Sequence, residues 1–213
     1  MSFGEPGRPA NSTPRRRASW TLRSCFRLPG RSPTQAREAF LAPLRLALNC
    51  VTRAQMYLSP ASPGEPESLR LSQDPLLLSS SVVEGGLRLR LRHQFRVVEE
   101  DGGRAQPWHV STQAYAYRVD RTDGESELLS WHWHPIPARG VQYPHLHVSG
   151  APHVPGAAHL PTSRVSIEAV LRLLLTDYGV PPRRSDFASV LDAAERPFLQ
   201  YRRWSSLPDV PWP

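Results

Sequence analysis

A run of alternating side chains over residues 87–97 constrains this chain more than any other feature. Leucine, phenylalanine and valine occupy alternate positions, interrupted once by His93, and arginine fills most of the positions between them. Successive side chains of a β-strand point to opposite faces, so a period of two predicts a strand with one buried face and one arginine-rich face. The chain therefore needs a sheet that packs on one side.

Three further segments have strand character, over residues 108–119, 127–134 and 143–148. Aromatic residues recur at every second position in the first two, as at Tyr115 and Tyr117. Asp-Gly pairs separate the first three strands, and this dipeptide is typical of hairpin turns. The four strands predict an antiparallel meander.

One amphipathic helix is expected over residues 164–178, with Ser163 as its N-cap and Gly179 just beyond its end. A shorter helix follows at about 186–195. The expected fold is α+β: a four-stranded antiparallel meander with one main helix packed on its apolar face, a short second helix and a disordered N-terminal arm.

The remaining segments define the expected organisation. Residues 1–35 are rich in proline, glycine, serine and arginine and form a disordered basic arm. Residues 36–75 hold a helix, over about 36–58, and a proline-rich linker. Residues 76–196 form the histidine-rich α+β domain, and residues 197–213 form a C-terminal tail rich in proline and tryptophan.

Composition indicates the kind of genome that encodes the protein and the compartment in which we expect it. All 26 basic residues are arginine and lysine is absent, which indicates a high-GC and bacterial genome. Residues 1–53 carry a net charge of +8 and the remainder carries −1, so the basic character belongs to the N-terminal part. No apolar run is long enough to cross a bilayer, and arginines interrupt every candidate signal sequence. We expect a cytoplasmic protein without membrane contact.

The histidines carry the chemistry. All eight lie between His93 and His159, and four form two His-x-His pairs: His132 with His134, and His145 with His147. Residues i and i+2 of a strand share a face, so pairing of the two strands would gather four imidazoles on one surface.

Three roles are open to such a surface. Paired imidazoles serve as general acid and base near neutral pH, as in metal-free RNA cleavage. Neutral imidazoles also bind divalent ions, zinc above all. The third possibility is a polar sheet face without a site. Because carboxylates and thiolates are scarce nearby, we expect no cofactor, with zinc at the same four histidines as the alternative.

A candidate anion site lies downstream. Thr162, Ser163 and Arg164 precede the main helix, whose N-terminal amide groups and dipole favour negative charge. These three residues are the expected phosphate-binding group.

The order of these elements resembles the TumE-like toxins of bacterial toxin–antitoxin pairs. The resemblance runs over about residues 80–178 and is carried by Tyr115 and Tyr117, by the aromatic and histidine segment 129–135, by the Pro-His segment 143–147 and by the helix start at 166–171. It implies an RNA substrate and an antitoxin-like protein partner.

The expected function is RNA cleavage or binding by the histidine face, without a metal. One of His145 and His147 would take the 2′-hydroxyl proton, and one of His132 and His134 would protonate the leaving oxygen. Arg164 or the helix N-terminus would hold the phosphate. The alternatives are a metal-binding or sensing domain without catalysis, and a structural or interaction protein.

Overall fold

The computed structural model describes residues 30–61, 65–99, 105–123, 127–134, 141–149, 155 and 158–201. Residues 1–29 of the expected disordered arm over 1–35, the Asp101-Gly102 turn and the tail from 202 onward lie outside these residues. The last residues of the expected arm are ordered, because α1 begins at Pro33. The helices are α1 (Pro33–Leu48), α2 (Ile167–Thr176) and α3 (Phe187–Tyr201). The strands are β1 (Met56–Leu58), β2 (Glu67–Leu71), β3 (Leu76–Leu78), β4 (Leu87–Glu99), β5 (Trp108–Arg121), β6 (Glu127–Trp133), β7 (His145–Val148) and β8 (Leu160–Pro161).

The expectation of a four-stranded meander with one main helix is wrong. The described strands form an eight-stranded antiparallel sheet in the order β1-β2-β4-β5-β6-β7-β8, with β3 also paired to β4. The four predicted strands are present as β4 to β7 and are consecutive in the sheet. The sheet extends past them on both sides, through β1 to β3 at one end and β8 at the other.

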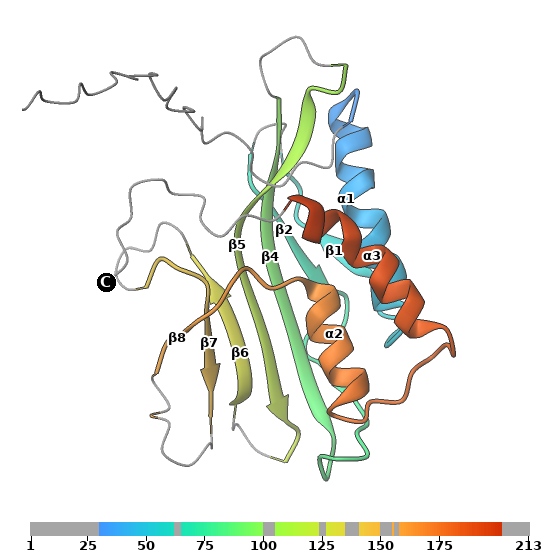
Figure 1. The fold of residues 1–213 in the computed structure, drawn as a ribbon, viewed down its shortest axis with the longest axis vertical. Coiled ribbons are helices and arrows are strands. Elements are labelled where there is room, and N and C mark those ends of the chain that lie inside the picture. The colour runs from blue at the N-terminus through green and yellow to red at the C-terminus, as the bar shows by residue number, and fades with distance from the viewer. Residues whose placement is uncertain are drawn as a thin grey trace, which may run out of the picture.

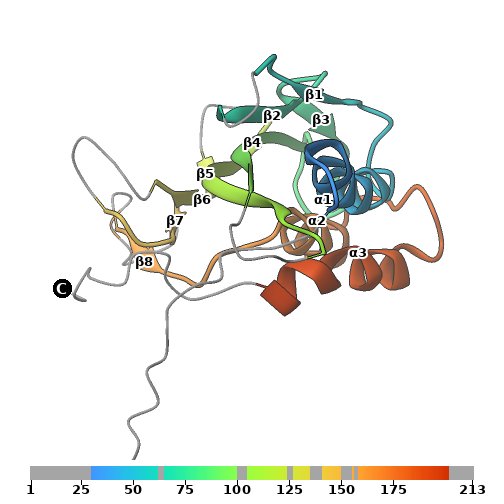
Figure 2. The same cartoon turned by 90° about the horizontal axis from the view of Figure 1, so that it is seen from above.

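All three helices lie on one side of the sheet (Figure 1). Seen from above, the sheet curves around α1 and α2, and α3 lies beyond them (Figure 2). The alternating leucines of β4 and the aromatic residues of β5 and β6 face these helices and are buried. The opposite face carries the arginines of β4 and the histidines of β6 and β7. Within the described residues, no helix is long and apolar enough to span a membrane.

Helix α1 belongs to the core rather than to a peripheral segment. Ser32 caps it, accepting a hydrogen bond from the backbone N–H of Gln35, and Pro33 occupies the first turn, where no N–H partner is lost. The helix ends at Leu48, ten residues before the expected end, and it tolerates Pro43 in its interior. Its buried stripe closes one side of the core: Ala36, Leu41, Leu44, Ala47 and Leu48.

The expected linker over 59–75 contains strand β2, and strand β1 occupies the end of the expected helix over 36–58. In β2 the buried and exposed positions alternate, with Leu69 and Leu71 facing the core. The prolines at 60, 66 and 75 lie between strands and remove no ladder hydrogen bonds, which is why this proline-rich segment still adds a strand to the sheet. Residues 59–75 are therefore only partly a linker.

The helix after the sheet begins later than expected. The side chain of Ser166, not Ser163, accepts the capping hydrogen bond, from the N–H of Ala169 at 2.9 Å. Gly179 has a φ of +62°, the left-handed conformation expected just beyond a helix end. Helix α3 reaches Tyr201, so the first residues of the expected tail are helical.

The packing of α1 gives a stability prediction. Leu41 is 0% exposed, whereas Leu46 in the same helix is 52% exposed. Leu41→Ala should lower the free energy of unfolding by about 2–5 kcal/mol, because it leaves a cavity between helix and sheet. Leu46→Ala, measured by the same urea titration, should change it by less than about 0.5 kcal/mol. Equal stability of the two variants would mean that α1 is not part of the core.

Candidate functional site

The histidine face lies on strands β6 and β7, on the side of the sheet away from the helices. These strands pair antiparallel with His132 opposite His145 and Ser130 opposite His147. The ring centroids of His132 lie 5.6 Å from His145 and 5.3 Å from His147, and His134 lies 5.7 Å from His132. The structure thus brings together all four histidines that the sequence analysis singled out.

A fifth histidine, His159, joins this group from the segment before β8. Strand β8 pairs with β7 so that Leu160 lies opposite Leu146, and the same register brings His159 opposite His147. Its ring centroid is 4.8 Å from that of His145 and 4.6 Å from that of His147. One ligand nitrogen from each of these three residues lies within 4.8 Å of the others. We call His145, His147 and His159 the histidine triad.

The sequence analysis assigned His159 no role because a two-residue strand leaves no periodic signal. The proline- and glycine-rich segment between His147 and His159 was the one available sign that the chain turns back on itself there.

The environment lowers the pKa of three of these imidazoles, those of His132, His145 and His147. Burial, followed by repulsion from the neighbouring histidines, lowers the pKa of His132 to about 4. Burial first and His159 next lower the pKa of His147, and burial is also the main cause of the lowered pKa of His145. A neutral imidazole has one nitrogen lone pair free for a metal ion or a proton.

Hydrogen bonds orient two of the rings. His145 Nδ1 lies 2.9 Å from the carbonyl oxygen of Tyr143, and a carbonyl only accepts, so Nδ1 carries the hydrogen and Nε2 carries the lone pair. His132 Nε2 is hydrogen-bonded to the hydroxyl of Ser130. Backbone carbonyl support of this kind is typical of metal-ligating histidines.

Charged residues continue the same face toward β4. Asp120 is fully buried and pairs with both Arg90 and Arg118. Glu127 lies 3.4 Å from Arg118 and acts electrostatically to raise the pKa of His147, against the larger effect of burial. The carboxylates nearest the histidines are therefore already engaged with arginines.

The expected phosphate-binding residues are not gathered beside the histidines. Arg164 is buried on the helix side, where its guanidinium lies 3.6 Å from the ring centroid of Trp133. The backbone N–H of Thr162 donates to the carbonyl of Pro144, and Ser163 is half-buried before the start of α2. Trp133 and His132 point to opposite faces, so the sheet separates Arg164 from the histidine face.

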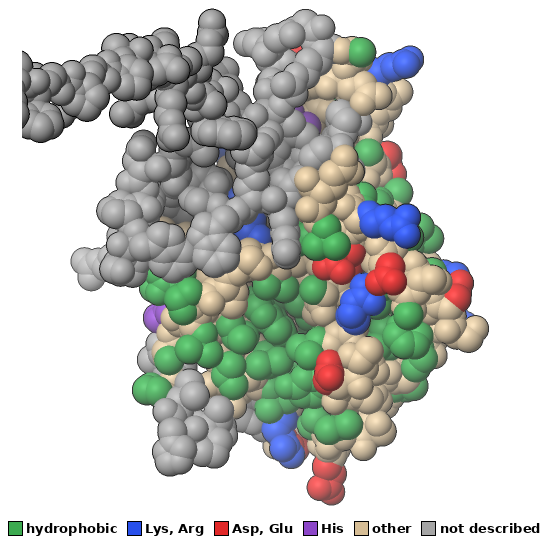
Figure 3. Space-filling view, in the orientation of Figure 1, with side chains coloured by type: hydrophobic (Ala, Val, Ile, Leu, Met, Phe, Trp, Pro, Cys, Tyr) green, Lys and Arg blue, Asp and Glu red, His purple; other side chains and the backbone are tan. Residues whose placement is uncertain are grey.

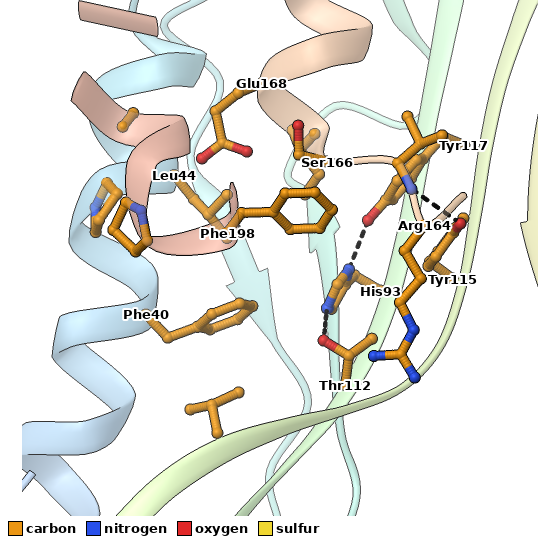
Figure 4. A pocket seen from close by; sticks show the side chains of 16 residues that line it. Phe40, Leu44, His93, Thr112, Tyr115, Tyr117, Arg164, Ser166, Glu168 and Phe198 are labelled. Carbon is orange, nitrogen blue, oxygen red and sulfur yellow. Dashed lines mark hydrogen bonds between the residues drawn. The ribbon is translucent and has the colours of Figure 1, made fainter. Parts of the chain in front are cut away.

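A second group of buried polar side chains lines a cavity of about 50 Å³ between the sheet and the helices (Figure 4). At its centre His93 Nδ1 lies 2.6 Å from the hydroxyl of Tyr117, and Nε2 lies 3.2 Å from that of Thr112. Burial, with a smaller effect of Arg164, lowers the pKa of His93 to about 3. Burial also raises the pKa of Tyr115 to about 12, so this phenol stays protonated.

Glu168 faces the same cavity from α2. It is 3% exposed, and burial raises its pKa to about 7, with a further increase from Glu195. Its own backbone N–H and Arg172 act in the opposite direction. This group could not be expected from the sequence, because an acidic residue in the first turn of a helix, as Glu168 is in α2, is common.

The raised pKa of Glu168 predicts a pH-dependent stability. Its unfolded-state pKa is near 4.5, so between pH 4.5 and 7 the folded chain binds more protons, and stability falls as pH rises through this window. Glu168→Gln should therefore gain about 2–3 kcal/mol relative to wild type between pH 5 and pH 8. Urea unfolding of both proteins at the two pH values measures this. A constant difference would contradict the assignment.

Comparisons of the chain with protein-family models, with curated proteins and with solved structures give no match. The candidate function therefore comes from the side chains themselves.

Proposed function

We propose that this protein binds a divalent transition-metal ion, zinc foremost, through the histidine triad. The observation that carries this proposal is the approach of three imidazoles from β7 and the segment before β8, with ligand nitrogens within 4.8 Å of one another. Zinc takes imidazole nitrogens at about 2.0–2.1 Å in a tetrahedral arrangement, which places ligands about 3.3 Å apart. His147 is half-buried and His159 is exposed, so closing this difference would require these two side chains to rotate toward a common ion.

The protonation states support the same conclusion. A metal ion competes with protons for the imidazole lone pair, and the lowered pKa values of His145 and His147 remove that competition at neutral pH. The hydrogen bond from His145 Nδ1 to the Tyr143 carbonyl leaves Nε2 with the lone pair that an ion would need. Three protein ligands leave a fourth position for water or for His132, whose ring centroid is 5.3 Å from that of His147.

A metal site with three histidine ligands and an open coordination position can activate a bound molecule as well as stabilise the fold. Structural zinc sites are closed by four protein ligands, whereas catalytic sites keep a position for water. A water molecule at this position would be activated as a nucleophile and exposed to solvent on the sheet face.

Metal-independent RNA cleavage is the second candidate, and the clustering of His132, His134, His145 and His147 on one face favours it. One neutral imidazole of His145 or His147 would remove the 2′-hydroxyl proton, and His134 would protonate the leaving oxygen, because the pKa of about 4 leaves His132 without a proton to give at neutral pH. Arg96 is exposed on β4 on this face and would attract the RNA backbone. An antitoxin-like protein would be the partner in this case.

Metal affinity tests the first proposal. Calorimetric titration of metal-free protein with zinc should give one ion per chain, and His147→Ala or His159→Ala should weaken binding by about 100-fold or more, since even an outer-shell change costs 10–100-fold. His134→Ala is the matched control, because His134 lies on the same face but outside the histidine triad; its zinc affinity should stay within about twofold of wild type.

Absorption spectroscopy of the cobalt-loaded protein provides an independent test of the same site. A tetrahedral nitrogen site should give cobalt-loaded wild-type protein visible absorption that His159→Ala loses. Equal zinc affinity in wild type and both triad variants, or equal loss in His134→Ala, would reject the histidine triad as the ligand set.

RNA cleavage is tested separately, in the presence of a chelator. The second candidate expects wild-type protein to cleave single-stranded RNA under these conditions and His134→Ala to lose about 10²–10⁴-fold in rate. Absence of cleavage by the wild type rejects this candidate and leaves the metal site unaffected.

A further inference from the structure

We propose that residues 26–29 form an additional strand that pairs with the edge of β5 that β6 leaves open, antiparallel and in register with Gly30. These residues come directly before Gly30, the first residue that the structure describes. The inference goes beyond metal binding and uses no residue of the histidine triad. It assigns a place in the sheet to a segment that composition alone assigns to a disordered arm.

Strand β5 extends beyond the end of its neighbour β6 (Figure 1). The pairing with β6 involves only Tyr115 to Asp120 of β5, whereas β4 pairs with β5 as far as Trp108. Over residues 108–112, β5 therefore has β4 on one side and, among the strands that the structure describes, no strand on the other. Such an edge presents a row of backbone N–H and C=O groups with which another strand can pair.

Gly30 makes the first pair of the proposed strand. It pairs antiparallel with Trp108, and each residue donates its backbone N–H to the carbonyl oxygen of the other, at 2.7 and 3.1 Å. Hydrogen-bonded pairs recur at every second residue of an antiparallel ladder, so the next such pair in this register is Leu28 with Val110. Continuation of the chain by four residues fills the open edge as far as the register shift of β5.

The side chains of the segment fit the two faces of the sheet in this register. Val110 and Thr112 line the cavity on the helix side, so Leu28 and Phe26, opposite them, would face the core and wall that cavity. Arg27 lies between these two residues and would face the polar side, as the arginines of β4 do. A shift by one residue would place the arginine in the core, so the alternation selects the register.

Pro29 is compatible with this register. Proline cannot donate to a ladder and occurs in edge strands where the missing N–H faces solvent. Pro29 would occupy the non-hydrogen-bonded position between Gly30 and Leu28, so its missing N–H would point away from β5. Proline also restricts the residue before it, here Leu28, to extended conformations, which favours a strand.

A pair of introduced cysteines tests the pairing in the full chain carrying Cys25→Ser. Arg27 and Ser111 would form a non-hydrogen-bonded pair with Cα atoms about 4.5 Å apart, within the range of a disulfide. Arg27→Cys with Ser111→Cys should therefore form an intramolecular disulfide under mild oxidation. Arg27→Cys with Arg96→Cys is the matched control and should form at least about tenfold less, because Arg96 lies opposite Ser111 one strand further away.

Hydrogen exchange with proline variants tests which backbone groups pair. In the wild-type chain the amides of Val110 and Thr112 should be protected, because each would donate to the added strand. Leu28→Pro removes a ladder donor and should speed exchange of both amides by about 100-fold or more. Arg27→Pro is the matched control, because the N–H it removes would face solvent; exchange should stay within about threefold of wild type.

Several results would overturn the proposal. Cross-links that join two chains, seen as dimers on non-reducing gels, would mean that the edge takes a second copy. Equal yields with Ser111→Cys and Arg96→Cys, or no cross-link in a folded variant, would mean that the segment is not held at this edge. Fast exchange of the Val110 amide in the wild type, or equal exchange in Leu28→Pro and Arg27→Pro, would contradict the pairing or its register. Melting temperatures identify a cysteine variant that fails to fold, and the exchange of the unmodified chain then decides.

Discussion

The long antiparallel pairing of β4 with β5 organises the molecule. The two strands remain paired from Leu87 opposite Arg121 to Glu99 opposite Trp108, with one register shift at Gln94 and Phe95. Because side chains alternate between faces along such a ladder, one pairing fixes a dry face for the helices and a polar face for arginines and histidines. A slip of one residue would exchange the two faces along the whole sheet.

Both candidate sites depend on that separation. Strands β6 to β8 continue the register of β5 and place the histidine triad near the sheet edge, on the polar face. On the other face, the same alternation sends His93, Tyr115 and Tyr117 toward α1 and α3, where burial lowers the pKa of the histidine and raises those of the two tyrosines. Hydrophobic side chains also gather beside α2 on this face (Figure 3), where Leu129 and Leu146 are only partly buried.

The sequence predicted those elements of the fold in which side chains of one kind recur at a fixed spacing. The alternation of 87–97 and the aromatic pairs at Tyr115 and Tyr117 located β4 and β5, and the two His-x-His pairs located the histidine face. The elements it missed are short or are bordered by proline, as β2, β3 and β8 are, and they acquire their order by pairing with a neighbouring strand. Local composition carries little of that information.

The site was predictable to a similar extent. His145 and His147 could be paired from spacing alone, but His159 reaches them by a chain reversal that no local pattern specifies. The buried polar cavity was hidden for a different reason: His93 and Glu168 come from separate elements, and their altered pKa values arise only when α1 and α3 cover the sheet. Conversely, Arg164 does not lie beside the histidines as expected, because its side chain stacks on Trp133 on the opposite face of the sheet.

X-ray absorption at the zinc edge of the zinc-loaded full chain shows whether three imidazoles coordinate one metal ion. Binding by the histidine triad predicts nearest neighbours at about 2.0–2.1 Å with the outer-shell scattering of about three imidazole rings. Histidine triad variants that still retain zinc should lose part of that scattering. A spectrum fitted by oxygen neighbours alone, or by sulfur at about 2.3 Å, would contradict the assignment.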